Sequence, residues 1–79
     1  MATSMQQATQ SFLEVAGVDK YVTMHVKTGV VGYCLDSSTP AASIPVIPID
    51  GTVTLRTSAT EKCYIRGNGT VAVISTDAD

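Results

Sequence analysis

The side chains of this chain that could act as nucleophile, base or metal ligand are few. His25 is the only histidine, and Cys34 and Cys63 are the only cysteines. A cysteine beside a histidine is the arrangement of a thiol nucleophile with its general base. Each cysteine, however, stands inside an alternating strand pattern, where a small buried thiol is common. The sequence therefore predicts no catalytic residue and no enzyme: we expect His25 on a strand surface and two structural thiols.

The same three residues do not form a metal-binding motif. The cysteines are 29 residues apart without a Cys-x-x-Cys pair, so Cys34, Cys63 and His25 would supply three ligands at most. The seven acidic residues are scattered, and none has the local spacing of a calcium loop. We predict no metal site and no cofactor. A Cys34–Cys63 disulfide stays open, with reduced thiols favoured because no secretory signal is visible.

Tyr21, Tyr33 and Tyr64 are the other side chains with a recognition chemistry, because tyrosines can stack on sugars or bases. A carbohydrate- or protein-binding β module would place them on one exposed face beside Asp or Asn side chains. Few basic residues accompany them and the formal charge is −2, so no nucleic-acid partner is expected. We expect these tyrosines at an interface or its rim, where tyrosine is enriched.

The composition favours an all-β fold. Of the 79 residues, 10 are Val, 5 are Ile and 11 are Thr. These β-branched side chains pack well on a pleated sheet and lose rotamer freedom in a helix. No stretch approaches the ~20 apolar residues of a membrane-spanning helix, so no membrane contact is expected. The sequence predicts a small antiparallel β-sandwich or barrel with an N-terminal arm and a C-terminal meander.

By composition the chain divides into three parts. Residues 1–10 are mostly polar, uncharged and free of Gly and Pro, and are expected to form an N-terminal arm. Residues 11–76 carry the strand patterns and are expected to form a single β domain. Residues 77–79 are expected to form a short acidic tail.

The conformation of the N-terminal segment stays open between a helix and a strand. A helix is indicated by Ser4 and Gln7, which have the form of a capping box, and by apolar residues at a near-helical period. The apolar residues of this period are Met5, Ala8, Phe12 and Val15. In the alternative, residues 1–10 are a flexible arm and residues 11–16 form a strand.

Firmer strand patterns begin at Tyr21. Residues 21–26 alternate between apolar and polar side chains, and residues 27–29 mark a turn into residues 30–35, which predicts a β-hairpin. Residues 36–43 are turn-formers and small residues and predict a loop.

The C-terminal half is expected to form an antiparallel meander. Residues 52–56 follow an Asp-Gly turn at residues 50–51 and alternate, with Val and Leu inward. Residues 62–66 alternate again. The Gly-Asn-Gly sequence at residues 67–69 predicts a tight hairpin turn into a final strand at residues 71–75.

Ile44 to Ile49 is an extended segment that is unsuited to the centre of a sheet, because Pro45 and Pro48 lack the N–H donor of a ladder hydrogen bond. Its aliphatic side chains still need a cover, which predicts an edge segment lying against a neighbour.

A chain this short buries only ~60% of its unfolded surface alone. We therefore expect an obligate or near-obligate homo-oligomer, with a trimer or ring as plausible as a dimer. The expected interface residues are Met5, Phe12, Val15, Ile44, Val46, Ile47 and Ile49.

The stretch from Ile44 to Ser75, IPVIPIDGTVTLRTSATEKCYIRGNGTVAVIS, resembles the terminal meander of small structural proteins of tailed bacteriophages. The resemblance lies in a Thr/Val-rich strand, a loop and a final strand, and no functional residue is carried over. It implies a non-enzymatic virion component made in the host cytoplasm: a capsid decoration (cement) protein or a head–tail accessory protein. Its partners would be copies of itself and other virion proteins. The alternative is the small carbohydrate- or protein-binding β module.

Overall fold

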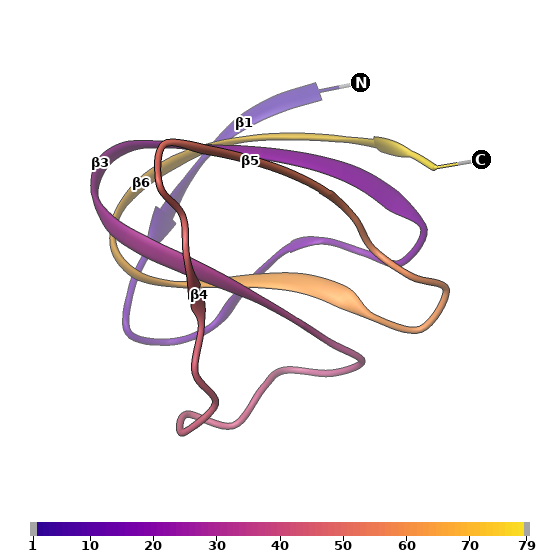
Figure 1. Cartoon of the computed structure of the whole chain (residues 1–79), viewed down its shortest axis with the longest axis horizontal. Coiled ribbons are helices and arrows are strands. Elements are labelled where there is room, and N and C mark those ends of the chain that lie inside the picture. The colour runs from indigo at the N-terminus through magenta and orange to yellow at the C-terminus, as the bar shows by residue number, and fades with distance from the viewer. Residues whose placement is uncertain (1, 79) are drawn as a thin grey trace.

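The computed structural model describes residues 2–78, which contain six β-strands and no helix (Figure 1). The expected all-β fold is therefore confirmed. Met1, at the start of the expected arm, and Asp79, at the end of the expected tail, lie outside the described residues. The strands are β1 (Ala2–Ala8), β2 (Leu13–Ala16), β3 (Lys20–Asp36), β4 (Ile47–Pro48), β5 (Thr52–Arg56) and β6 (Lys62–Asp77).

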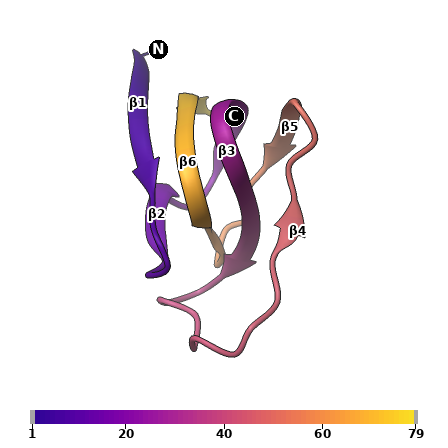
Figure 2. The ribbon, with the colours of Figure 1, turned by 90° about the vertical axis from the view of Figure 1, so that its left-hand side faces the viewer.

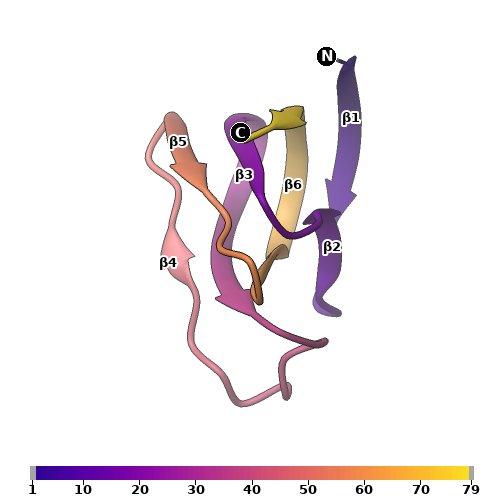
Figure 3. The ribbon, with the colours of Figure 1, turned by 90° about the vertical axis from the view of Figure 1, so that its right-hand side faces the viewer.

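Two long antiparallel strands, β3 and β6, form the centre of the single sheet. They pair from Lys20 opposite Asp77 to Asp36 opposite Lys62. β1 and β2 pair one after the other with β6, while β5 and β4 do the same with β3. Figures 2 and 3 show this order as an outer column of β1 and β2, then β6, β3, and a second outer column of β4 and β5. The expected C-terminal meander is wrong, because β3 lies between β5 and β6.

Glycines let both central strands bend at the same level. Gly29 has a φ of 81° and Gly67 a φ of 152°, a region that side-chain-bearing residues rarely adopt. Gly29 lies opposite Gly69 in the ladder. A Cβ on Gly29 would lie 2.0 Å from the Asn68 carbonyl oxygen, and one on Gly69 would lie 2.1 Å from that of Thr28. The close approach of the two backbones at the bend therefore requires glycine on both strands.

This bend replaces the two hairpins that the glycine-containing segments predicted. β3 continues through residues 27–29 to Asp36, with a register shift between Val26 and Thr28, and β6 continues through residues 67–69. A positive-φ glycine reverses a strand only when its two flanks pair with each other. Here both flanks pair with the opposite long strand, so the glycines bend the strands without reversing them.

The bend divides the sheet into two half-sheets that share one core. The first half-sheet comprises β1, β5, residues 20–26 of β3 and residues 70–77 of β6; the second comprises β2, β4, residues 30–36 and residues 62–68. Their inner faces both contribute side chains to one buried cluster, and full burial of an aliphatic side chain contributes ~1.5–3 kcal/mol. The buried members are Ala8, Ala16, Val22, Met24, Val31, Ile49, Cys63, Ile65, Val71 and Val73.

The N-terminal segment is a strand of this sheet. Seven positions of β1 pair with β6, from Ala2 opposite Ser75 to Ala8 opposite Gly69, and Ala8 is 1% exposed in the core. Of the two alternatives left open, the helix is wrong, because ladder pairing satisfies the backbone and buries Ala8. β2 confirms a strand within residues 11–16. The described residues of the expected flexible arm instead belong largely to the sheet.

Replacing Gly29 with alanine is expected to lower the free energy of unfolding by at least ~2 kcal/mol in urea denaturation. The added Cβ would collide with the Asn68 carbonyl oxygen at 2.0 Å, and the backbone would keep its φ of 81°. Gly17→Ala is the matched control, because its added Cβ meets nothing within 4 Å. That variant should be close to neutral. Equal stability of the two variants would contradict a bend that depends on glycine.

Candidate interaction surface

The sheet keeps His25 apart from both cysteines. His25 is exposed on the outer face of the first half-sheet, and its Nδ1 lies 2.6 Å from Thr52 Oγ1. Cys63 is buried in the core, with its Sγ 4.0 Å from the sulfur of Met24. Cys34 lies nine residues beyond His25 on the same strand. The thiol and imidazole groups therefore do not form a nucleophile–base pair.

The two cysteines carry free thiols. Cys34 lies opposite Tyr64, whereas Cys63 lies opposite Leu35, so the two thiols are on opposite faces of the sheet. Burial raises the pKa of Cys63 to about 12. Burial and, secondly, the Asp36 carboxylate raise the pKa of Cys34. Protonated thiols are poor nucleophiles, and both cysteines act here as small apolar side chains.

The described residues offer no preformed polar or metal site in the interior. Within residues 2–78, no group of three or more His, Cys, Asp or Glu side chains is placed to hold a metal ion. Every buried side-chain nitrogen or oxygen in that range has a hydrogen-bond partner. The same range contains no helix with the length and apolar character to cross a membrane.

The three tyrosines do not share a surface. Tyr64 is 3% exposed, Tyr33 is half-buried against the core, and Tyr21 alone is largely exposed, at 50%. The Arg56 guanidinium lies over the Tyr21 ring, 5.9 Å from its centroid. A carbohydrate-binding surface could therefore use the ring of Tyr21 for stacking, but not the rings of Tyr33 and Tyr64 beside it.

The residues expected at an interface are not gathered in one place. Ile49 is 9% exposed in the core of the chain itself, and Val15 is partly buried against that core. Met5 and Ile47 are 56% and 57% exposed, but they lie on β1 and β4 at opposite edges of the sheet (Figure 2). Sequence reasoning missed this division, because it depends on which strands are neighbours.

Phe12 and Ile44 belong to a clamp around Arg66, which holds the loop of residues 37–46. Arg66 donates hydrogen bonds from Nη1 to the Ala42 carbonyl oxygen at 2.5 Å and from Nη2 to that of Ile44 at 2.9 Å. Its guanidinium carbon lies 4.4 Å from the centroid of the Phe12 ring, a cation–π contact. One side chain of β6 thus fixes the loop against the outer face of the second half-sheet.

The clamped loop covers that outer face. Gly32, Cys34 and Tyr64 are all buried there. Val46 packs so closely on Gly32 that an added Cβ would lie 2.4 Å from Val46 Cγ2. Pro40 of the loop is also buried. Val46, expected at an interface between subunits, therefore packs within its own chain.

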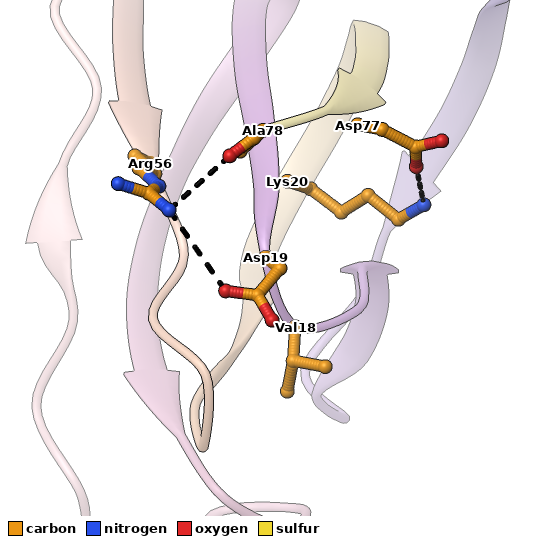
Figure 4. Close-up of a pocket in the computed structure, with 6 residues that line it drawn as sticks. All are labelled: Val18, Asp19, Lys20, Arg56, Asp77 and Ala78. Carbon is orange, nitrogen blue, oxygen red and sulfur yellow. Dashed lines mark hydrogen bonds and ion pairs between the residues drawn. The ribbon is translucent and has the colours of Figure 1, made fainter.

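An open hollow of about 460 Å³ lies where the start of β3 meets the end of β6 (Figure 4). The Lys20 ammonium binds the Asp77 carboxylate and holds the pKa of that carboxyl below its usual value. Arg56 Nη2 donates to the Ala78 carbonyl oxygen at 3.2 Å and lies 4.0 Å from Asp19 Oδ1. Because these charges neutralise one another, the hollow is a structural corner. Ala78, in the expected tail, is buried there.

No loop within residues 2–78 covers the outer face of the first half-sheet in this way, and we call that face the threonine face. Every second residue of four neighbouring strands contributes to it, and none of these residues is buried. Of the set, only Arg56 carries a formal charge. The threonine face consists of Thr3, Met5 and Gln7 of β1, Ala72, Ile74 and Thr76 of β6, Tyr21, Thr23 and His25 of β3, and Thr52, Thr54 and Arg56 of β5.

Two pairs of polar side chains on the threonine face hydrogen-bond across the β3–β5 ladder. Thr23 Oγ1 and Thr54 Oγ1 are 3.2 Å apart, and Thr52 Oγ1 is the 2.6 Å partner of His25. A polar group that already has a protein partner loses less when water is removed. The face is thus polar in composition but inexpensive to cover, which suits contact with another protein surface.

Comparison of the chain with protein-family models, with curated proteins and with solved structures finds no match. The threonine face is therefore identified as a candidate interaction surface from the geometry of the sheet alone. The alternating pattern of residues 21–26 and 52–56 predicted its β3 and β5 members, whereas its β1 members were not expected in a strand. Their assembly into rows, such as Thr3, Ile74, Thr23 and Thr54, follows only from the strand order.

Arg66→Ala is expected to release the loop and expose the Cys34 thiol. The rate of Cys34 modification by a thiol reagent, followed by mass spectrometry, should rise several-fold, while Cys63 stays protected in the core. Arg56→Ala is the matched control. It removes the same charge from the first half-sheet, whereas the clamped loop and Cys34 belong to the second. Equal protection of Cys34 in both variants would contradict the clamp.

The pKa of Cys63 predicts a loss of stability in alkali. Because the folded pKa of about 12 lies above the ordinary value of 9.0, the unfolded chain loses this proton first as the pH rises. The free energy of unfolding should therefore fall between pH 9 and 12, by at most ~1.4 kcal/mol per pH unit from this group. In urea denaturation Cys63→Ala should show a shallower fall, and identical pH profiles would contradict the assignment.

Proposed function

We propose that this chain is a non-enzymatic structural protein of a tailed-phage virion, either a capsid decoration protein or a head–tail accessory protein. It acts by packing its threonine face against other virion proteins and by associating with copies of itself. It is made in the host cytoplasm and ends in the particle. The observation that carries the proposal is the uncovered threonine face on a chain whose other outer face is covered by its own loop.

The physical character of the threonine face supports a packing role. Its strands are paired into a continuous sheet, so the surface is pre-ordered and loses little conformational entropy on binding. Tyr21 and Arg56, at one corner, are residue types enriched in protein interfaces. Because only Arg56 is charged, binding through this face should depend weakly on salt.

The sequence supports the virion setting. The stretch from Ile44 to Ser75 resembles the terminal segment of small phage structural proteins, and it supplies both β5 and most of β6. Those strands contribute half of the threonine face. Five of the twelve residues of the proposed contact thus lie on the part of the chain that carries the resemblance.

A double substitution on the threonine face, Thr52→Glu with Thr54→Glu, is expected to abolish incorporation into particles. Two carboxylates without partners would be buried at the contact, which should weaken binding by at least about ten-fold. The measurement is co-sedimentation of the purified protein with virions of the phage that encodes it, after mass spectrometry has tested for the protein in those virions.

Ser38→Glu with Thr39→Glu is the matched control, because it adds the same charge to exposed positions on the clamped loop. This control should bind particles as the unmodified protein does. Absence of the protein from virions would refute the proposed function. Equal binding of the two double variants would refute the role of the threonine face.

A further inference from the structure

β1 is an open edge strand that lacks the usual protection against pairing. It pairs with β6 on one side only, and Figure 2 places it at the outside of the sheet. In an edge strand, alternate N–H and C=O groups point away from the sheet and can receive another strand. β1 contains no charged residue and no proline, and its residues from Thr3 to Gln7 are exposed or half-buried. It is therefore a seven-residue strand whose outward-pointing N–H and C=O groups can pair with another strand.

The other edge strands are protected in the ways that natural sheets use. β2 has four residues, carries Glu14 and pairs with β6 through a register shift. β4 has two residues, one of them Pro48. β5 has five residues, ends at the charged Arg56 and follows Asp50. Among the described strands, β1 alone combines length with the absence of charge and proline.

We propose that a second copy of the chain occupies this edge: two β1 strands pair antiparallel about a two-fold axis at Met5. The inference rests on the self-association included in the proposed function and names the contact that produces it. A two-fold contact of this kind uses the same edge on both copies, so it closes as a dimer and does not grow into a fibre.

The sequence of β1 is compatible with this arrangement, because an uncharged strand can lie against a copy of itself without repulsion. Residues of the two copies whose numbers add up to ten lie opposite each other, and none of them is charged. The central pair buries two methionine side chains that are each 56% exposed in the single chain. The opposed pairs are Met5 with Met5, Ser4 with Gln6, Thr3 with Gln7 and Ala2 with Ala8.

The pairing would also extend the surface proposed for particle binding. Thr3, Met5 and Gln7 form the β1 border of the threonine face. Joining two copies at this border places their threonine faces side by side on one continuous sheet. The dimer would therefore present twice the contact area of a single chain to a virion surface, without any change in fold.

The test uses a pair of oppositely charged variants at the exposed positions 3 and 7. In Thr3→Glu with Gln7→Glu, like charges meet twice across the two-fold axis, and the same holds for Thr3→Lys with Gln7→Lys. Each variant should sediment at the chain mass of 8.2 kDa, whereas the unmodified protein sediments at twice that mass. An equimolar mixture should restore the dimer, because every opposed pair then joins an acid to a base.

The control is Thr52→Glu with Thr54→Glu, which places the same charge on the opposite edge of the threonine face. It should remain dimeric while losing particle binding, so failure of the dimer and failure of the proposed function are separable. Dissociation of this control as well would overturn the β1 contact in favour of packing through the face or pairing between β1 and β5. A monomeric unmodified protein, or no recovery on mixing, would also overturn it.

Met5→Cys provides an independent measurement that adds no charge. Opposed Cβ atoms of an antiparallel pair lie ~4.5–5.5 Å apart, close enough for a disulfide after small adjustments. Under mild oxidation this variant should form a covalent dimer, while Ile47→Cys, equally exposed on β4, should not. Equal cross-linking of the two variants would overturn the proposal.

Discussion

The structure depends on the close contact between two glycine-containing segments at the middle of β3 and β6. Gly29 and Gly69 face each other where backbone atoms of one strand occupy the space of a side chain on the other. This contact lets two long strands fold over together, so that one sheet supplies both layers of a core. A chain without tryptophan, with a single phenylalanine and many short aliphatic side chains, thereby encloses a continuous apolar cluster.

The bend also creates two outer faces, and the chain treats them differently. On the second half-sheet, Arg66 clamps the loop of residues 37–46 over Cys34 and Tyr64. On the first half-sheet, no described segment of the chain lies over the threonine face. The connections that flank β5 and precede β3, at residues 49–51, 57–61 and 17–19, are short. Because one outer face is covered and the other is not, the threonine face is the one that a partner could contact.

His25 and Cys63, which could act as base and nucleophile, each have a partner on a neighbouring strand. Cys63 is a core side chain against Met24, and its proton is held tightly because the thiolate would be desolvated. His25 bonds to a threonine on the neighbouring strand. The Lys20–Asp77 and Arg56–Asp19 ion pairs neutralise the charges around the hollow. What remains available for recognition is an almost uncharged face and one unprotected edge.

The sequence by itself determined the fold class and the faces of individual strands. β-branched residues and two-residue alternation placed Cys63 with Ile65 inward and the residues of 21–26 on two faces, because these are local properties of a pleated strand. Strand order, and the choice between bending and reversing at Gly29, were decided by tertiary structure alone. A positive φ is compatible with either outcome, and the long-range partner of each flank selects one. The burial of Ile49, which the sequence placed at an interface, was decided in the same way, since only the assembled core shows which aliphatic side chains it encloses.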